Sequence, residues 1–243
     1  MITQEELRKA YAPTGTLRVA LNHGNGVLVG RTSRGQPVGI TVDLAQRLGR
    51  ELGLRIEFVE YLRAVDVSDR AEADAWDVCF LAVDPKRMAV IDFTQPYVQI
   101  DGAYLAAAHC TARDSAELVA SGGRVASVIG SAYTLTLERM PGAEALVQMP
   151  TLPLTLRAMD AGQVDAVAGI GVVMEAEAAK RPGARVLSPP FMQIRQAMGI
   201  VRGRGPAAEH LRAFVTRLAA SGEIGDILER HGVLRSCAVP PEG

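Results

Sequence analysis

Two short segments carry side chains that can hold an anion. The first contains Arg87, in the run Asp84-Pro85-Lys86-Arg87. A guanidinium presents a planar fork of N–H donors that fits a carboxylate at two points and stays charged at neutral pH. We therefore predict Arg87 as an anion-binding residue. The alternative is a surface arginine paired with Asp84 or Asp92.

The second segment is Gly130-Ser131-Ala132-Tyr133, which follows the strand-like run 124–129. A Gly-Ser turn at a helix start offers backbone N–H groups and a hydroxyl, and the helix dipole favours negative charge there. We predict these four residues as a second anion-binding group. The alternative is that Ser131 only caps its own helix.

The sequence has no pattern for nucleophilic catalysis, no metal-ligand spacing and no phosphate-binding glycine loop. His23, Glu60 and Glu138 are the only plausible acids or bases near these segments. We predict no catalytic residue, no metal and no cofactor. The three cysteines, which have no metal-ligand spacing and are odd in number, are predicted to be reduced structural thiols: Cys79, Cys110 and Cys237.

The composition excludes some classes of partner. The 243 residues include 26 basic and 27 acidic ones, so no nucleic-acid partner is expected. Hydrophobic residues make up 48% of the chain, but the apolar runs are too short to span a membrane. The N-terminal residues have no apolar leader. The protein is expected in the periplasm if a leader was removed, and in the cytoplasm if Met1 is the native start.

The elements that must position these residues alternate between strand and helix. Strand patterns occur at 16–21, 55–59, 77–83, 91–97, 103–108, 124–129, 145–149, 164–168, 185–187 and 197–201. Helix patterns occur at the N-terminus, after Thr41 as a cap, and at 68–75, 115–121, 131–140, 153–161 and 172–181. The chain ends in a helix with Leu211, Phe214, Val215 and Leu218 on one stripe, followed by a second helix from 223 to about 231. This rhythm predicts an α/β fold with mostly parallel sheets. It restarts near residue 115, which predicts two Rossmann-like lobes.

Four segments resemble the extracytoplasmic solute-binding proteins of family 3, the amino-acid ABC transporter type. They are Thr16-Leu-Arg-Val-Ala-Leu, Gln36-Pro-Val-Gly-Ile-Thr-Val-Asp43-Leu-Ala, Asp84-Pro-Lys-Arg87 with Ile91-Asp-Phe-Thr-Gln-Pro-Tyr97, and Arg124-Val-Ala-Ser-Val-Ile-Gly130-Ser131 with Gly162-Gln-Val-Asp165-Ala. The resemblance covers residues 16–231.

The resemblance implies a type II periplasmic-binding fold. Lobe 1 would comprise residues 1–105 and 200–243, and lobe 2 residues 106–198, with hinge strands at 103–107 and 197–201. A ligand would bind in the cleft between them and favour their closure. The resemblance also places Arg87 at the family's carboxylate clamp. A monomer is expected, with a membrane permease as its partner in transport.

One departure from the family bears on the ligand. Amino-acid binders place an aspartate after the 164–168 strand to accept bonds from the ligand's ammonium, and Ile170 stands at that position. Burying an ammonium beside isoleucine is costly. We therefore expect a small carboxylate-bearing ligand, such as a mono- or dicarboxylate or an uncharged-amine analogue, rather than a standard α-amino acid.

The remaining candidate ligand residues, each with a loop, core or hinge role as its alternative, are Asn22, Asn25, Tyr61, Phe80, Ala82 and Gln196.

Two other functions use the same scaffold. The first is an enzyme similar to cyclohexadienyl dehydratase, which needs an acid or base at the ligand. The second is a sensor domain detached from a receptor, which shares every motif. We expect a binding protein rather than an enzyme, because no motif supports catalysis and a fold alone does not specify one.

Overall fold

The computed structural model describes residues 2–241, and these form two compact units. Lobe 1 holds the described residues up to Gln99 and those from Arg195 onward, and lobe 2 holds Ile100–Ile194. Met1 and residues 242–243, which we predicted to belong to lobe 1, lie outside the described residues.

The chain passes between the lobes within two strands, β6 (Ile91–Ala106) and β11 (Met192–Val201). The sequence predicts the crossings at 103–107 and 197–201, with lobe 2 at 106–198. The units instead change at 99/100 and 194/195. Both strands begin before the hinge segments that the resemblance implies, β6 at Ile91 and β11 at Met192.

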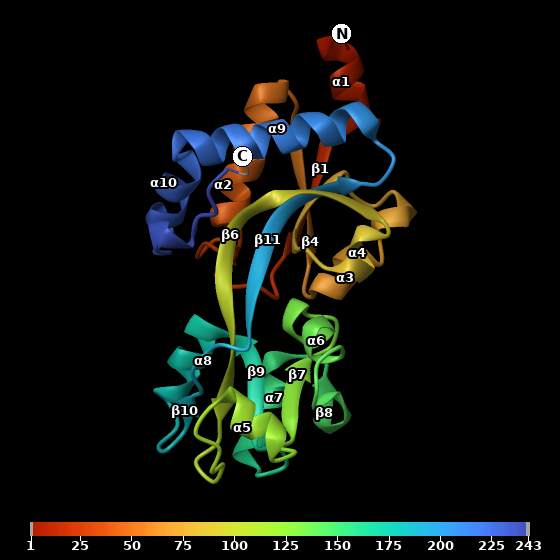
Figure 1. The fold of residues 1–243 in the computed structure, drawn as a ribbon. Helices are drawn as coiled ribbons and strands as arrows, with labels where there is room; N and C mark the ends of the chain where they lie inside the picture. The colour runs from red at the N-terminus through yellow and green to blue at the C-terminus, as the bar shows by residue number, and fades with distance from the viewer. Residues whose placement is uncertain (1, 242–243) are drawn as a thin grey trace. The chain divides into compact units, whose positions relative to one another are not determined.

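In lobe 1, three parallel strands form one side of the sheet. They are β1 (Leu17–Asn22), β4 (Ile56–Tyr61) and β5 (Val78–Ala82), in the order β4-β1-β5. β11 pairs antiparallel with β5, and β6 follows it (Figure 1). Because these three strands are parallel, their carboxyl ends meet at one edge.

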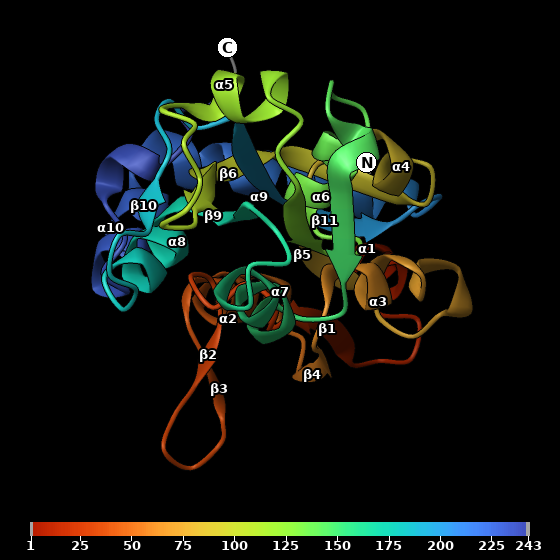
Figure 2. The ribbon, with the colours of Figure 1, turned by 90° about the horizontal axis from the view of Figure 1, so that it is seen from below.

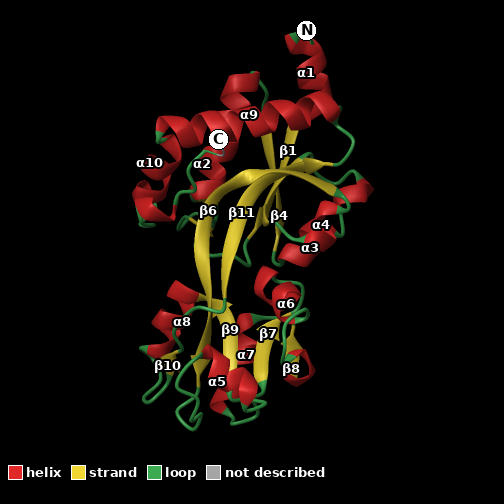
Figure 3. Ribbon diagram, in the orientation of Figure 1, coloured by secondary structure: helices red, strands yellow, loops and turns green. Residues whose placement is uncertain are grey.

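Helices cover the sheet of lobe 1, as the colouring by secondary structure shows (Figure 3). They are α1 (Gln4–Tyr11), α2 (Ile40–Leu52), α3 (Ala64–Ser68), α4 (Pro85–Met88), α9 (Gly205–Ser221) and α10 (Glu223–Arg230), with short 3-10 turns at Ala71–Ala73 and Arg235–Cys237. α1 and α10 both pack against α9. Figure 2 shows a hairpin of β2 (Gly30–Arg31) and β3 (Pro37–Val38) with its connecting loop.

Two predictions for lobe 1 need correction. Thr41 does not cap α2, because its hydroxyl donates to the Leu28 carbonyl oxygen and Gly39 holds the cap position with φ 136°. A Cβ atom at Gly39 would lie 2.6 Å from the Leu28 oxygen, so the N-cap position of α2 requires glycine. The helix predicted at 68–75 is instead split between α3 and the 3-10 turn at 71–73.

A buried carboxylate joins the separate segments of lobe 1. Asp77, which is fully buried, accepts bonds from the side chain and the backbone N–H of Arg18 on β1 and from Arg204 at the start of α9. Arg204 also donates to the backbone oxygen of Tyr11. The C-terminal segment is therefore tied to the N-terminal one around a single charged residue.

The strand order in lobe 2 is β6-β9-β7-β8, with β10 on the other side of β6. The strands are β7 (Val125–Val128), β8 (Leu146–Met149), β9 (Ala166–Ile170) and β10 (Arg185–Val186). β7 is parallel to both β8 and β9, whereas β6 is antiparallel to β9 and β10. The helices are α5 (Ser115–Ala120), α6 (Ala132–Leu137), α7 (Leu152–Asp160) and α8 (Gly171–Ala178), with a 3-10 turn at Ala143–Ala145.

Side chains alternate between the two faces of the lobe 2 sheet and build two cores. Tyr104 and Ala106 pack in one cluster with Leu118 and Leu137, while Leu105 and Ala107 pack in the other. This alternation is what the two-residue period of a strand requires. The apolar run at 103–108 therefore ends a long strand that is covered on both faces.

One strand, β6, replaces the two predicted at 91–97 and 103–108. Pro96 lies in the part of β6 that belongs to lobe 1, where it is the last strand of that lobe's sheet. Edge strands tolerate proline because one row of N–H groups makes no ladder bond. None of the helices among residues 2–241 is both long and apolar enough to span a bilayer.

Candidate ligand-binding edges of the two lobes

In lobe 1, four of the predicted ligand residues lie at the carboxyl edge of the sheet. Asn22 ends β1 and is in register with Tyr61, which ends β4. Ala82 ends β5 and pairs with Gln196 on β11. Parallel pairing brings these strand ends to one edge, which is where α/β sheets bind ligands. Gln196 is buried, and Tyr61 is partly exposed.

Arg87 lies in α4, the single helical turn that follows β5. Only 2% of the residue is exposed, and its Nη1 atom donates to the Ala82 carbonyl oxygen at 2.9 Å. Burial lowers the pKa of the guanidinium to about 10, and the negative charge of Asp84 opposes that shift. Arg87 is therefore a buried cation at neutral pH, rather than the surface arginine of the alternative interpretation.

Asp84 shapes the turn that holds Arg87. Its carboxylate caps α4 by accepting the N–H of Lys86 at 2.9 Å, and the residue is 3% exposed. Pro85 occupies the first position of the helix, where its missing N–H costs nothing. The Asp84-Pro85 pair thus forms a regular helix start.

Two other predicted ligand residues of lobe 1 lie in the core or in a loop turn. Phe80 is 2% exposed, and its ring meets that of Tyr97 edge-on at a centroid distance of 6.1 Å. Asn25 is buried, and its backbone oxygen accepts the N–H groups of Leu28 and Val29. Phe80 is therefore a core residue, and Asn25 organises the loop after β1.

The acid–base candidates form hydrogen bonds or ion pairs with each other or with neighbouring residues. In lobe 1, Nε2 of His23 lies 2.6 Å from Oε2 of Glu60, and that carboxylate also pairs with Arg31 at 2.6 Å. In lobe 2, Glu138 accepts a bond from Gln148 at 2.7 Å. These contacts give each carboxylate a structural partner.

In lobe 2, the predicted Gly-Ser turn follows β7 directly. Gly130 has φ 66°, a left-handed conformation that glycine adopts without strain. Ser131 is the N-cap of α6, and its Oγ atom accepts the N–H of Thr134 at 3.1 Å. The capping role is therefore present. It leaves the N–H groups of Ala132 and Tyr133 without an acceptor inside the helix, as helix geometry dictates.

A buried hydroxyl network holds this turn in place. The Oγ1 atom of Thr134 is fully buried and lies within 2.8 Å of the hydroxyls of Ser127 and Ser131 and 2.6 Å from the Val128 oxygen. Tyr133 packs against the core cluster that contains Tyr104. Burial raises the pKa of Tyr133 to about 12, and a bond from Ser131 opposes this shift.

Ile170 ends β9, the neighbour of β7, and is 9% exposed. Because β7 and β9 are parallel, Ile170 lies at the same edge as the Gly-Ser turn. Sequence reasoning missed a carboxylate at this edge. Asp101 on β6 precedes Gly102, which is in register with Ile170. The antiparallel pairing of β6 with β9, which no local pattern predicts, brings Asp101 there.

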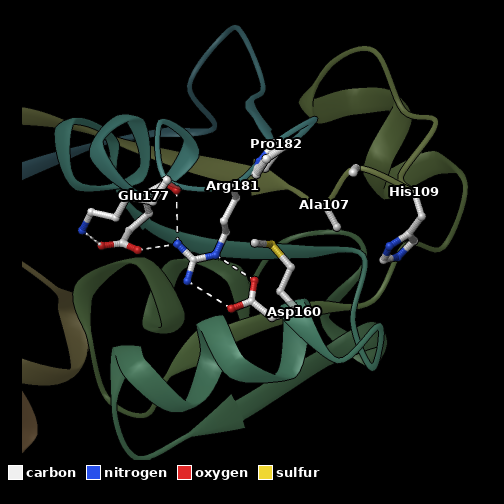
Figure 4. Close-up of a pocket in the computed structure, with 10 residues that line it drawn as sticks. Ala107, His109, Asp160, Glu177, Arg181 and Pro182 are labelled. Carbon is white, nitrogen blue, oxygen red and sulfur yellow. Dashed lines mark hydrogen bonds and ion pairs between the residues drawn. The ribbon is translucent and has the colours of Figure 1, made fainter.

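A pocket of about 490 Å³ opens at the opposite edge of lobe 2 (Figure 4). Its lining residues are Ala107, Ala108, His109, Met159, Asp160, Glu177, Lys180, Arg181, Pro182 and Ala184. Arg181 bonds both Asp160 and Glu177 there, and Lys180 pairs with Glu177 at 2.6 Å. These charges satisfy one another, so the pocket lacks a charged group aimed at a ligand.

The described part of the chain contains no group of three or more His, Cys, Asp or Glu residues that could hold a metal ion. Cys79 and Cys110 are both buried, and burial raises the pKa of the Cys79 thiol. Both are core members, as the prediction of structural thiols requires.

Comparison with known proteins gives one family and many similar folds. No curated protein sequence matches the chain. A crystal structure of a mutant of ArgBP from T. maritima has 20% identity and a TM-score of 0.76, over 93% of this chain and 99% of that one. The substrate-binding protein AbpA of an amino-acid ABC transporter from Streptococcus pneumoniae, bound to L-arginine, has 21% identity and a TM-score of 0.76, over 92% and 97%.

A histidine kinase sensor domain similar to periplasmic binding proteins has 20% identity and a TM-score of 0.77, over 90% of this chain and 97% of that one. At these identities the likeness establishes the fold, which is the predicted type II periplasmic-binding fold. The model of the bacterial extracellular solute-binding proteins, family 3, matches residues 17–233. The chain therefore belongs to family 3 of the bacterial extracellular solute-binding proteins.

Proposed function

We propose that the protein is the ligand-binding component of an ABC-type transporter, or a related soluble sensor, and that its ligand is a small carboxylate. The family supports the binding role. The similarity to transporter proteins and to a sensor domain supports both settings equally. In the transporter setting the partner is a membrane permease.

The observation that carries the proposal is the buried cation behind the lobe 1 edge. Arg87 is held by the Ala82 oxygen beside Gln196, at the ends of β5 and β11. A guanidinium that has already lost its water is a strong partner for a carboxylate, because little further desolvation is required when the anion arrives. In lobe 2, the N–H groups of Ala132 and Tyr133, which have no acceptor inside α6, are a separate candidate group for an anion.

The absence of an acidic side chain at position 170 argues against a standard α-amino acid as the ligand. Ile170 ends the strand beside the Gly-Ser turn, where an α-ammonium would lie if its carboxylate bound that turn. An ammonium without a hydrogen-bond acceptor is costly to bury. Several similar structures hold arginine, so arginine belongs in any test panel.

The experiment is native mass spectrometry of the purified protein for a co-purified ligand, followed by calorimetric titration with carboxylates and α-amino acids. We expect simple carboxylates to bind. Arg87→Met should weaken that binding roughly tenfold to a hundredfold, because a hydrogen bond to a charged group contributes about 1.5–3 kcal/mol. Arg87→Lys should lose less.

Arg50→Met, an exposed arginine on α2, serves as the control and should bind like the wild type. Because Arg87 is buried, each variant needs a melting curve to show that it folds. Tight binding of α-amino acids with no response to simple carboxylates would refute the ligand class. Binding unchanged in folded Arg87→Lys and Arg87→Met would remove Arg87 from the site.

The dehydratase alternative has no specific contact in its favour, and incubation with prephenate or arogenate tests it directly. Ligand-induced closure and a monomeric state remain predictions. Small-angle scattering with and without ligand measures closure, and light scattering on a sizing column measures the mass.

A further inference from the structure

Gln196 is a buried polar residue of lobe 1 whose side chain has no hydrogen-bond partner within the protein. It lies on β11, in the part of that strand that belongs to lobe 1, and is 6% exposed. Across residues 2–241, the other buried Ser, Thr, Asn, Asp and Arg side chains all make hydrogen bonds, as Asn25, Thr94 and Thr155 do. The Gln196 amide makes none among those residues. A buried amide is costly without a partner, so we expect one from outside the chain.

The Gln196 amide also differs from an enclosed polar group. The hydroxyl oxygen of Tyr97 likewise has no hydrogen-bond partner among the described residues, but it is fully enclosed by protein atoms. The amide atoms of Gln196 are not enclosed in this way, although the residue as a whole is buried. The stem of the side chain is therefore covered, and its amide end is open to a solute.

Strand pairing places Gln196 at the carboxyl edge of lobe 1. It pairs with Ala82, the last residue of β5. In the adjacent pair, the N–H of Val83 donates to the Arg195 oxygen at 2.9 Å. Because hydrogen-bonded and non-hydrogen-bonded pairs alternate, Ala82 and Gln196 form the closer, non-hydrogen-bonded kind of antiparallel pair. Their side chains lie on the same face of the sheet.

Arg87 contacts the same strand end. Its Nη1 atom donates to the Ala82 carbonyl oxygen at 2.9 Å. The Cα atoms of a non-hydrogen-bonded pair lie about 4.5 Å apart. The Nη1 atom of Arg87 and the Cα atom of Gln196 are therefore at most about 10 Å apart. A small carboxylate held by Arg87 can bring a second polar group to the amide.

The chemistry of an amide limits what that second group is. A carboxamide is uncharged and has two N–H donors and a carbonyl acceptor. An ammonium would bond only the carbonyl oxygen, and a carboxylate would bond only the N–H groups. A hydroxyl or a carboxamide both donates and accepts, so it can satisfy both ends of the amide. A ligand that lacks such a group would leave the amide without a partner, which weakens its binding.

We propose that Gln196 is a specificity-determining residue, and that the ligand is a carboxylate that also carries an uncharged hydroxyl or carboxamide group. This inference rests on the proposed function, because it takes the carboxylate to bind at Arg87. It narrows the ligand class from any small carboxylate to hydroxy acids and monoamides of dicarboxylic acids.

The test is calorimetric titration with five-carbon acids that differ in one substituent. Pentanoate is the parent compound. The analogues with an uncharged group are 2-hydroxypentanoate, 5-hydroxypentanoate and glutaramate, the monoamide of glutarate. The charged analogues are glutarate and 2-aminopentanoate. We expect at least one uncharged analogue to bind the wild type about fivefold or more tightly than pentanoate and than both charged analogues.

Gln196→Met keeps the length of the side chain and removes the amide. It should abolish the advantage of the preferred analogue and leave the affinity for pentanoate unchanged. Because the amide makes no bond within the described chain, the melting temperature should not fall. Gln46→Met, an exposed glutamine on α2, is the matched control and should change none of these values. Equal losses for pentanoate and the preferred analogue in Gln196→Met, or a clear fall in its melting temperature, would overturn the proposal.

The outcomes separate this inference from the proposed function. If the wild type binds pentanoate as tightly as all three uncharged analogues, Gln196 does not select a polar group, while carboxylate binding stands. If none of the six acids binds, this inference fails. The proposed function fails as well only if no other carboxylate binds.

Discussion

Replacing Asp77 by asparagine should destabilise lobe 1 strongly, because this carboxylate is fully buried between two arginines. Its Oδ2 atom accepts the backbone N–H and Nε of Arg18 at 2.9 and 3.0 Å. Its Oδ1 atom accepts Nη2 of Arg18 and Nη1 of Arg204, both at 2.8 Å. Asparagine has one acceptor oxygen, so in either orientation two of these four contacts become donor against donor.

The magnitude follows from those contacts. Each lost bond to a charged group costs about 1.5–3 kcal/mol, and breaking a buried ion pair typically costs about 3–5 kcal/mol. The arginine side chains are 16% and 14% exposed, so water compensates part of the loss. We therefore expect the free energy of unfolding to fall by about 3 kcal/mol.

The matched control is Asp66→Asn. Asp66 also bonds an arginine at two points, through Nε and Nη2 of Arg63, but the two side chains are 32% and 39% exposed. An exposed pair contributes about 0.2–1 kcal/mol. The two substitutions therefore make the same chemical change to aspartates that differ in burial.

Urea unfolding monitored by tryptophan fluorescence measures both variants. The chain has one tryptophan, Trp76, which is fully buried beside Asp77 and donates to the Val67 oxygen, so the signal reports on lobe 1. A loss for Asp77→Asn below about 1 kcal/mol, or no greater than that of Asp66→Asn, would refute the reasoning.

Two further predictions concern lobe 1. Gly39→Ala should lower the free energy of unfolding in urea by more than about 2 kcal/mol, because its Cβ atom would lie 2.6 Å from the Leu28 oxygen. Gly15 also has positive φ but lies in open space, so Gly15→Ala should lower that free energy by about 1–2 kcal/mol. Equal losses of stability in the two variants would contradict this prediction. Burial lowers the pKa of His210 below its usual 6.5, and the negative charge of Glu51 opposes this shift. The unfolded chain therefore binds more protons than the folded chain, and the free energy of unfolding should fall as the pH drops below 6.5. His210→Asn should weaken that pH dependence between pH 7.5 and 5.5, and an unchanged slope would contradict the assignment.

Much of the fold follows from local patterns. The two-residue period of the strands and the helix pattern after Thr41 predict their elements without tertiary information, and Gly53, whose φ is 63°, ends that helix. The Gly-Ser turn is also predictable, because a glycine and a capping serine after an apolar run specify a strand that enters a helix. These features depend on residues within a few positions of one another.

The rest depends on contacts between distant residues. The true lengths of β6 and β11, the core position of Phe80 and the burial of Arg87 follow from strand order and packing. Asp101 shows the difference most clearly: its neighbours Gly171 and Gln193 are 70 and 92 positions away, and only the register of β6 with β9 brings the first of them beside it.

The sequence by itself therefore determined the elements and the types of group available for binding, since propensities, caps and periodicity act over short stretches of chain. The tertiary structure decided which of those groups share an edge and which are buried, since strand order and register are set by the packing of the whole lobe.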